Sequence, residues 1–277
     1  SRSGLTPLMD LIAYHKSFAW PSQLNEIYPE KFSLSFLSRI VELPFFNSKI
    51  KFERYIPKHS EAYSFWNNSF KGFRRPFRDL TSDDVNPIIS KKFRKSVSSV
   101  MRYQGKNNFI AEYSGWSRID FLKTIFPNAK FIHIVRDGRA VANSLTNVYF
   151  WRGYEGTNQW RWGTPDKDLL DLWEKYNKSF LGLAGIQWKI LVNNINDNGR
   201  NLGDDFLTIR YEDMVSNPHK SAKNCIDFIG LDSDSDYFKR HLNTVKIIDA
   251  NSSKFRISPW KKSMTPNQIG MLNDILS

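Results

Sequence analysis

Apolar residues run almost without interruption through residues 130–135 in the second half of the chain, and residues 205–211 are predicted as another buried strand. Such runs are typical of strands that are buried on both faces of a parallel sheet. The segments 139–148 and 169–195, which lie between them, place apolar residues at helical spacing instead. Strands that alternate with helices in this way predict right-handed β-α-β crossovers and a parallel sheet.

Weaker patterns predict the remaining elements. Near the start, Thr6 can cap a helix whose first position is Pro7. Residues 26–104 are rich in aromatic and basic residues and lack clean strand alternation, so we expect mostly helix with long loops there. The other predictions are a strand at 109–112 and helices at 118–126, at 219–229 before Gly230, and at 266–276 after Thr265.

The chain of 277 residues is long enough for one large α/β domain, and no repeat or Gly/Pro/Ser-rich linker divides it. We therefore expect a single domain that covers residues 1–277. In open parallel sheets, ligands bind beyond the carboxyl ends of the strands. The residues that follow the predicted strands are accordingly the first candidates for chemistry.

The formal net charge of +12 indicates anionic partners such as nucleotides, nucleic acid, acidic sugars or a membrane surface. A basic, solvated surface without a specific partner is the alternative. The apolar runs are far shorter than the roughly 20 residues of a membrane-spanning helix, and no secretory signal pattern is found, which favours the cytoplasm. Cys225 is the single cysteine and the histidines lack metal-ligand spacing, so no disulfide and no metal site are predicted.

The opening of the chain combines residue types that suit an anion. Gly4 lets the backbone approach a ligand, and the N–H groups at the start of the following helix favour negative charge. Arg2 adds a permanently charged planar group, while Ser3 and Thr6 add hydroxyl donors. An ordinary capping turn has the same composition. No lysine follows the glycine as it does in nucleoside triphosphatase loops, which argues against Mg²⁺–ATP chemistry.

A second candidate site follows the predicted strand at 130–135. Arg136 falls where the strand ends, and Ser144 lies in the next helix. An arginine at a strand tip and a hydroxyl on the following helix can converge on one phosphate. The alternative is a local ion pair of Asp137 with Arg136 or Arg139, beside an ordinary helical serine.

Three motifs together resemble the sulfotransferase family. They are Arg2-Ser3-Gly4-x-Thr6, then Ile134-Val135-Arg136-Asp137-Gly138-Arg139 with Ser144, then Ile209-Arg210-Tyr211-Glu212-Asp213 followed by Asn217-Pro218. Their order and spacing match the family from residue 1 to about residue 260, and the likeness is greatest to the branch with tyrosylprotein sulfotransferases and many bacterial relatives. The combination is specific, whereas each motif alone is not.

The resemblance implies a fold and a donor. The fold would be an α/β domain with a P-loop-type parallel sheet flanked by helices and a helical, aromatic-rich lid or insertion at about 26–105. The donor would be the nucleotide PAPS, which leaves as PAP, with no metal. The residues expected to bind the 5′-phosphosulfate are Arg2, Ser3, Gly4, Leu5 and Thr6. Those expected at the 3′-phosphate are Arg136 and Ser144, with Tyr211 beside the nucleotide.

The resemblance also implies a loop at about 250–263 that covers the nucleotide. Its basic and aromatic residues are Lys254, Arg256, Trp260, Lys261 and Lys262. A solvated basic loop is the alternative interpretation of this stretch.

The general base is the weakest part of the resemblance. Relatives often carry a glutamate shortly after the first helix, where this chain has Ser22 and Gln23, neither of which can act as a base at neutral pH. Sulfuryl transfer, like phosphoryl transfer, requires in-line geometry and stabilisation of charge on oxygen, a role for Arg2 and the loop amides. The candidates for accepting the acceptor's proton are Glu61, Glu112 and His59, in that order, and each has a surface or salt-bridge role as its alternative.

Two aromatic and basic clusters are candidate acceptor surfaces, because aromatic faces with nearby cations suit sugars, phenols and acidic polymers. The first lies in a predicted acceptor-side loop at about 149–165, with Tyr149-Phe150-Trp151-Arg152-Gly153-Tyr154 and Trp160-Arg161-Trp162. The second comprises Tyr63, Phe65, Trp66, Phe70, Phe73, Arg74 and Arg75. Plain packing of a lid onto the sheet is the alternative for both.

Sulfuryl transfer from PAPS to an acceptor hydroxyl is therefore the predicted activity. The acceptor is open among carbohydrate, lipid, peptide tyrosine and small alcohol, and no specific nucleic-acid partner is expected. Another P-loop transferase, such as a kinase, is one alternative. A non-enzymatic polyanion or nucleic-acid binder is the other, supported by the net charge but by no recognised binding module.

Overall fold

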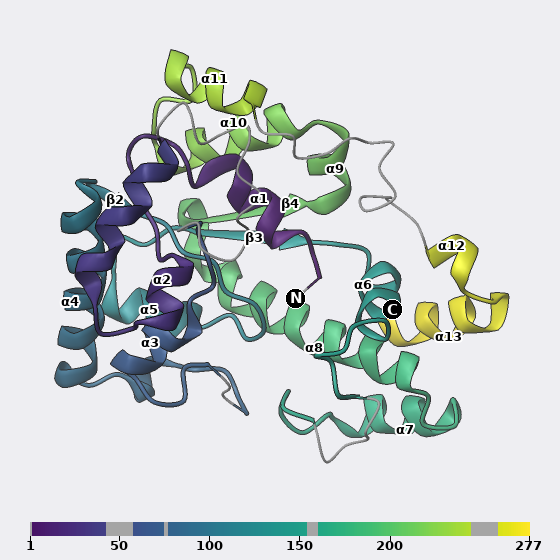
Figure 1. Ribbon diagram of the computed structural model, residues 1–277. Coiled ribbons are helices and arrows are strands. Elements are labelled where there is room, and N and C mark those ends of the chain that lie inside the picture. Colours follow the sequence, from purple (N-terminus) through teal and green to yellow (C-terminus); the bar gives the residue numbers. More distant parts are fainter. Residues whose placement is uncertain (1, 43–57, 75–76, 154–159, 245–259) are drawn as a thin grey trace.

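Helices surround two short pairs of parallel strands in the computed structural model, which describes residues 2–42, 58–74, 77–153, 160–244 and 260–277 (Figure 1). β1 (Phe18–Ala19) pairs with β2 (Asn108–Phe109), and β3 (Phe131–Val135) pairs with β4 (Phe206–Arg210). The predicted combination of helices with parallel strands is confirmed. The described residues form two separate sheets, so a single P-loop-type sheet stays a prediction.

The β3–β4 pair brings two distant parts of the chain to one edge. Val135 lies opposite Arg210 at the carboxyl ends of the two strands. β3 leads into α6 (Gly138–Leu145), and β4 leads directly into α9 (Tyr211–Ser216). Residues that follow the two strands are therefore neighbours, as the parallel arrangement predicts.

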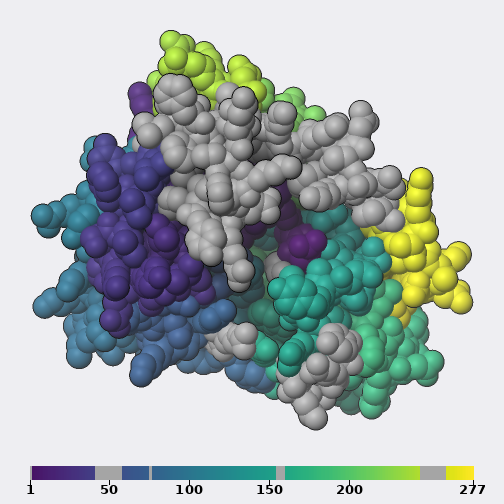
Figure 2. Space-filling view, in the orientation of Figure 1, coloured from purple at the N-terminus to yellow at the C-terminus, as the bar shows by residue number. Residues whose placement is uncertain are grey.

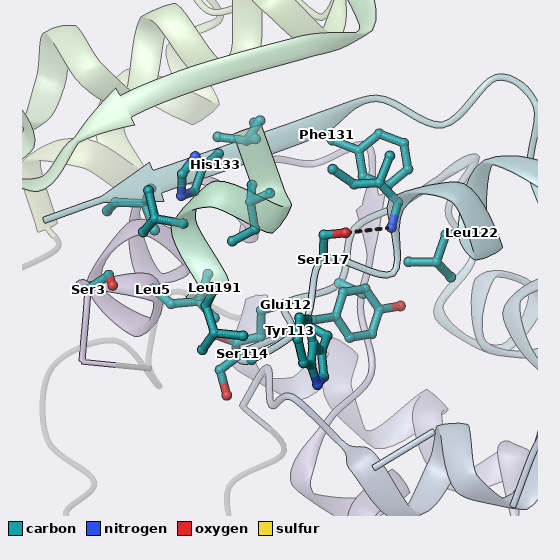
Figure 3. Close-up of a pocket in the computed structure, with 18 of the residues that line it drawn as sticks. Ser3, Leu5, Glu112, Tyr113, Ser114, Ser117, Leu122, Phe131, His133 and Leu191 are labelled. Carbon is teal, nitrogen blue, oxygen red and sulfur yellow. Dashed lines mark hydrogen bonds between the residues drawn. The ribbon is translucent and has the colours of Figure 1, made fainter. Parts of the chain in front are cut away.

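A cavity of about 380 Å³ lies between the two strand pairs. Phe109 lines it from β2 and residues 131–134 line it from β3, while Ser3 and Leu5 line it from the start of the chain (Figure 3). Its walls are mainly apolar, and no described strand pairs with β3 on the side away from β4.

Helices fill the rest of the described chain. In chain order they are α1 (Leu5–Ile12), α2 (Gln23–Ile27), η1 (Phe32–Glu42), α3 (Tyr63–Ser69), η2 (Ser82–Asp84), α4 (Pro87–Gln104), α5 (Ile119–Ile125), α6, α7 (Lys167–Lys175), α8 (Phe180–Gly199), η5 (Arg200–Asp205), α9, α10 (Pro218–Ile229), α11 (Asp236–Thr244), α12 (Trp260–Ser263) and α13 (Pro266–Leu276). None of those described is long and apolar enough to cross a membrane.

Several predicted boundaries were wrong. α1 begins at Leu5 because Gly4, with φ of 93°, occupies the capping position that was predicted for Thr6. The predicted helix at 169–195 is two helices, α7 and α8, separated by a turn in which Asn177 and Lys178 both have positive φ. The strand predicted at 109–112 extends only over Asn108–Phe109. By contrast, α10 ends at Gly230 and α13 is capped by Thr265, as predicted.

The aromatic cluster of residues 63–73 is largely core, which agrees with the packing alternative rather than with an acceptor surface. Phe65, Trp66 and Phe73 are fully buried and pack against Phe93 and Phe121. Arg74 remains half exposed, and Arg75 lies outside the described residues. The described part of 26–105 is helical, and its aromatic side chains supply the interior of this half of the molecule, so a lid role stays a prediction.

Candidate active site

A cleft of about 1140 Å³ opens at the carboxyl ends of β3 and β4. Its lining includes the backbone and side chains of the first turn of α1, from Gly4 to Pro7, together with Arg2, Arg136 and Tyr211. In the space-filling view, the purple start of the chain lies at the bottom of a hollow that teal residues border (Figure 2). A single cleft is therefore lined by six of the residues expected to bind the donor: Arg2, Gly4, Leu5, Thr6, Arg136 and Tyr211.

The two predicted anion sites adjoin each other. The Arg2 Nε donates a hydrogen bond to the Ser144 Oγ at 2.9 Å. The Arg136 Nη1 donates to the carbonyl oxygen of Arg2 at 3.1 Å. The guanidinium carbon of Arg136 lies 4.3 Å from the centroid of the Tyr211 ring, within reach of a cation–π interaction. Residues separated by more than 100 positions thus form one cationic group.

The backbone next to Arg136 is fixed by hydrogen bonds, and the guanidinium of Arg136 does not form an ion pair with the adjacent Asp137. The Trp188 Nε1 donates to the Arg136 carbonyl at 3.1 Å, and the Glu212 Oε1 accepts from the N–H of Asp137 at 3.1 Å. The Asp137 carboxylate pairs with Arg139 at 2.7 Å, so the local ion pair forms with Arg139 and leaves Arg136 facing the cleft. Burial lowers the pKa of Arg136, as expected for a cation with little water around it.

Gly4 packs directly against Tyr211, and this contact leads to a prediction. A Cβ at this position would lie 2.3 Å from the Tyr211 Cδ2, and the φ of 93° is unfavourable for any side chain. For Gly4→Ala we expect the loop to shift away from Tyr211 and the affinity for PAP, measured by calorimetry, to fall by about tenfold, which is about 1.4 kcal/mol of binding free energy. Gly230→Ala is the matched control, because Gly230 has φ of 88° but open space around it. Equal PAP affinities in the two variants would contradict the prediction.

Glu61 is the candidate base that reaches the cleft. Its carboxylate lines the cleft near Tyr63 and Ser114, and burial raises its pKa above the ordinary value of a carboxyl group. A raised pKa makes a carboxylate a stronger proton acceptor at neutral pH. The structure therefore brings the first of the three candidates to the site.

The other two base candidates lie behind the cleft wall. His59 and Glu112 are both buried, and the His59 Nδ1 contacts the Glu112 Oε1 at 2.8 Å. The second ring nitrogen contacts the Asp10 Oδ1, also at 2.8 Å. Both nitrogens of His59 are therefore engaged, and neither is free for an acceptor hydroxyl. Among these groups only Asp10 lines the cleft, and the sequence analysis missed it.

The remaining donor candidates occupy different places. Ser3 lines the cavity between the strand pairs rather than the cleft. Trp260 is buried and lies under Arg139, with the guanidinium carbon 4.3 Å from its ring, and the Lys261 Nζ is 5.7 Å from the same ring. Lys254 and Arg256 fall outside the described residues.

The first aromatic and basic cluster borders the cleft. Its described members that line the cleft are Tyr149, Phe150, Trp151, Arg152, Gly153, Trp160, Arg161 and Trp162. Tyr149 is 91% exposed and Phe150 is 52% exposed, whereas Trp151 is buried and donates from its Nε1 to the Gln187 Oε1. One end of this wall is thus anchored in the core, and its rim presents aromatic faces to solvent. This arrangement suits a binding surface better than the buried cluster at 63–73 does.

Comparison with known proteins identifies the family through a sequence model. A sequence model of the sulfotransferase family matches residues 1–236. Carbohydrate sulfotransferase 1 from Rattus norvegicus and that from Mus musculus are each 26% identical over 114 residues, which is 39% of this chain but only 25% of theirs. The solved sulfotransferase domain of the olefin synthase from Synechococcus PCC 7002 aligns with a TM-score of 0.49 and 16% identity over 100% of this chain and 91% of that one. Because the family match extends over most of its length, this chain belongs to the sulfotransferase family.

Proposed function

We propose that the protein transfers a sulfuryl group from PAPS to an acceptor hydroxyl. The observation that carries the proposal is the pairing of Arg2 and Arg136 at one sheet edge, joined through a hydrogen bond from Arg136 to the Arg2 carbonyl. A nucleotide with a phosphosulfate at one end and a phosphate at the other requires two cationic groups in one cleft. Family membership supports the same donor.

The proposed donor contacts follow from the chemistry of each group. The N–H groups at the start of α1, with the Arg2 guanidinium, would bind the phosphosulfate. Arg136 and the Ser144 hydroxyl would bind the 3′-phosphate, and Tyr211 would position the nucleotide beside Arg136. Since Gly4 has no side chain, the backbone at this point can lie close to the ligand.

The proposed reaction is an in-line displacement at sulfur. The acceptor oxygen forms a bond to sulfur while the bond from sulfur to the bridging oxygen of PAPS breaks, and PAP leaves with that electron pair. The Glu61 carboxylate takes the proton of the acceptor hydroxyl. Arg2 and the loop amides stabilise the charge that develops on the leaving oxygens.

The cleft wall also favours a class of acceptor. Four arginines line it away from the donor residues: Arg74, Arg118, Arg152 and Arg161. The Arg118 guanidinium already donates to the carbonyls of Phe73 and Trp116, which leaves three facing an acceptor. Arg152 and Arg161 have no ion-pair partner among the described residues, and Arg74 lies 3.9 Å from Glu26. With the neighbouring aromatic rings, these cations favour an acceptor that carries a negative charge of its own next to a ring.

Matched pairs of acceptors test this preference. We expect glucuronate to be sulfated faster than glucose, and 4-hydroxyphenylacetate faster than its uncharged alcohol analogue tyrosol. A hydrogen bond to a charged group contributes about 1.5–3 kcal/mol, so kcat/KM should differ by about 10- to 100-fold within the preferred pair. Arg161→Gln should reduce that ratio, and the exposed Arg200→Gln should leave it unchanged. A ratio near one in both pairs would rule out an anionic acceptor.

Thermal unfolding with PAP, PAPS or Mg²⁺–ATP tests the donor without any acceptor. A ligand at a hundred times its Kd adds about 2.7 kcal/mol to the free energy of unfolding. We expect PAP and PAPS to raise the melting temperature and Mg²⁺–ATP to leave it unchanged. Stabilisation by Mg²⁺–ATP alone would favour a kinase, and binding that disappears steeply with salt and does not saturate at one site would favour a polyanion binder.

A further inference from the structure

A group of three ionisable side chains, two of them buried, extends from the cleft into the wall behind it, and the proposed reaction does not use it. It consists of Asp10, His59 and Glu112, with His59 in the middle. The side chains of His59 and Glu112 are each only 3% exposed, whereas that of Asp10 is 39% exposed and faces the cleft. Buried charges are costly to keep, so an arrangement of this kind needs a reason.

The three residues belong to the three segments that carry the site. Asp10 is on α1, whose first turn is the donor loop. His59 lies two positions before Glu61, the proposed base. Glu112 lies two positions before Ser114, whose side chain is hydrogen-bonded to the Glu61 carboxylate. The His59 ring therefore connects α1, which carries the donor loop, to the segment that contains Glu61 and to the segment that contains Ser114.

The two hydrogen bonds require the ring to be charged. An ionised carboxylate only accepts hydrogen bonds, and a neutral imidazole has a single N–H to donate. Contacts of 2.8 Å from both ring nitrogens to carboxylate oxygens therefore need the imidazolium. The groups that surround it are Asp10 from α1, Tyr14 from the turn after α1, and Glu112 from the segment after β2, with the Tyr14 ring centroid 5.7 Å away. Both charged neighbours are acids.

We propose that the His59 imidazolium is a positioning residue that fixes Glu61 relative to the donor loop by bridging Asp10 and Glu112. The proposal rests on the proposed function, because it assumes that Glu61 acts on an acceptor at the donor loop. His59 touches no substrate in this scheme. It acts through the placement of α1 against the segments of residues 58–62 and 112–114.

The bridge has a defined pH dependence. Burial alone lowers the pKa of His59, but the hydrogen bonds to Asp10 and Glu112 outweigh it and raise that pKa to about 9. A raised pKa means that the bridge is complete below the ordinary value of 6.5 and is lost as the pH rises through about 9. We therefore expect kcat to fall on the alkaline side of its profile, with no matching fall in PAP affinity.

His59→Gln tests the bridge, with His15→Gln as its matched control. His15 is equally buried just after α1, but it contacts the Asp232 carbonyl rather than a carboxylate. A misplacement of about 1 Å costs about 100-fold in rate, so kcat with the best of the four probe acceptors should fall by about 100-fold in His59→Gln. PAP affinity by calorimetry should match that of His15→Gln. A merely structural role would lower both quantities, or neither, and would overturn the proposal.

Asp10→Asn supplies a second test that does not depend on the folding of His59→Gln. Asparagine can still accept from the ring but removes one counter-charge, so the pKa of His59 should fall by about one unit or more. Imidazole NMR on the wild type and on Asp10→Asn should show this lower pKa. The fall of kcat on the alkaline side of its pH profile should move to lower pH by the same amount. A His59 ring that titrates near 6.5 in the wild type overturns the bridge.

The two proposals fail in different ways. If the wild type does not bind PAP, the proposed function is wrong. If the wild type binds PAP and turns over, but His59→Gln and His15→Gln share one kcat and one pH profile, only the bridge is wrong.

Discussion

Arg2→Ala is expected to lower the rate of sulfuryl transfer by about 10²–10³-fold, or about 3–4 kcal/mol of barrier. Arg2 adjoins the start of α1 and is hydrogen-bonded to Ser144, so in the proposed reaction it would face the position where the leaving oxygens gain charge. Water can replace its contacts in the free protein, but it cannot supply a fixed positive charge in the transition state. The loss should therefore appear in kcat measured at saturating PAPS.

Arg2→Lys separates charge from geometry. Lysine keeps the charge but loses the planar pair of donors, and at a site with two partners this substitution is not conservative. We expect an intermediate rate. Arg240→Ala on α11, where the side chain is exposed, serves as the control and should retain the wild-type rate. Near-normal kcat in Arg2→Ala, with the protein folded, would remove Arg2 from the transition-state contacts.

Glu61→Gln is expected to lower kcat by about 10²–10⁴-fold, the usual contribution of a general base. Glutamine preserves the shape of the side chain and an oxygen for the bond to Ser114, but it cannot take a proton. Burial raises the pKa of Glu61, so in the wild type kcat should rise with pH as this carboxyl group ionises, at a pH above the ordinary value for glutamate. This rise of kcat on the acidic side of the pH profile should be absent from the residual activity of Glu61→Gln.

The control for this variant is Glu174→Gln, an exposed glutamate that pairs with Lys178 on the surface. It should keep both the rate and the acidic limb of the wild type. An acidic limb that persists unchanged in Glu61→Gln would transfer the base role to another group, with Asp10 the first to test because it also lines the cleft.

The sequence pattern predicted the positions of several elements closely. The segments at 130–135 and 205–211 became β3 and β4 to within one residue at each end, but the predicted burial on both faces was wrong, because only His133, Ile134 and Ile209 in these strands are buried. α10 and α13 were equally clear, since Gly230 and Thr265 carry capping chemistry that depends only on local sequence.

Features that depend on tertiary contacts have no recognisable pattern in the sequence. β1 and β2 are two residues each, too short for any period to be seen. The break between α7 and α8 depends on Asn177 and Lys178 in left-handed conformations, which neither residue requires. The cap at Gly4 is likewise fixed by its contact with Tyr211, more than 200 positions away.

The candidate site also contains some residues that could be predicted from the sequence and one that could not. Arg136 was a candidate because it follows a strand end, and the resemblance to the family gave donor roles to Arg2, Arg136 and Ser144, which stay predictions. Asp10 was missed, although it lies one turn after Thr6 on the same face of α1. Its importance comes from His59 and Glu112, whose approach to it only the folded chain reveals.

The closeness of Arg2 and Arg136 also bears on the energetics of the empty enzyme. Burial is the main cause that lowers the pKa of Arg136, and the charge of Arg2 acts in the same direction, whereas Tyr211 and Glu212 oppose it. A bound anion would add a further negative charge beside both cations and would favour the protonated form of Arg136. Its effect on the stability of the folded chain should therefore be largest at low ionic strength, where the charges are least screened.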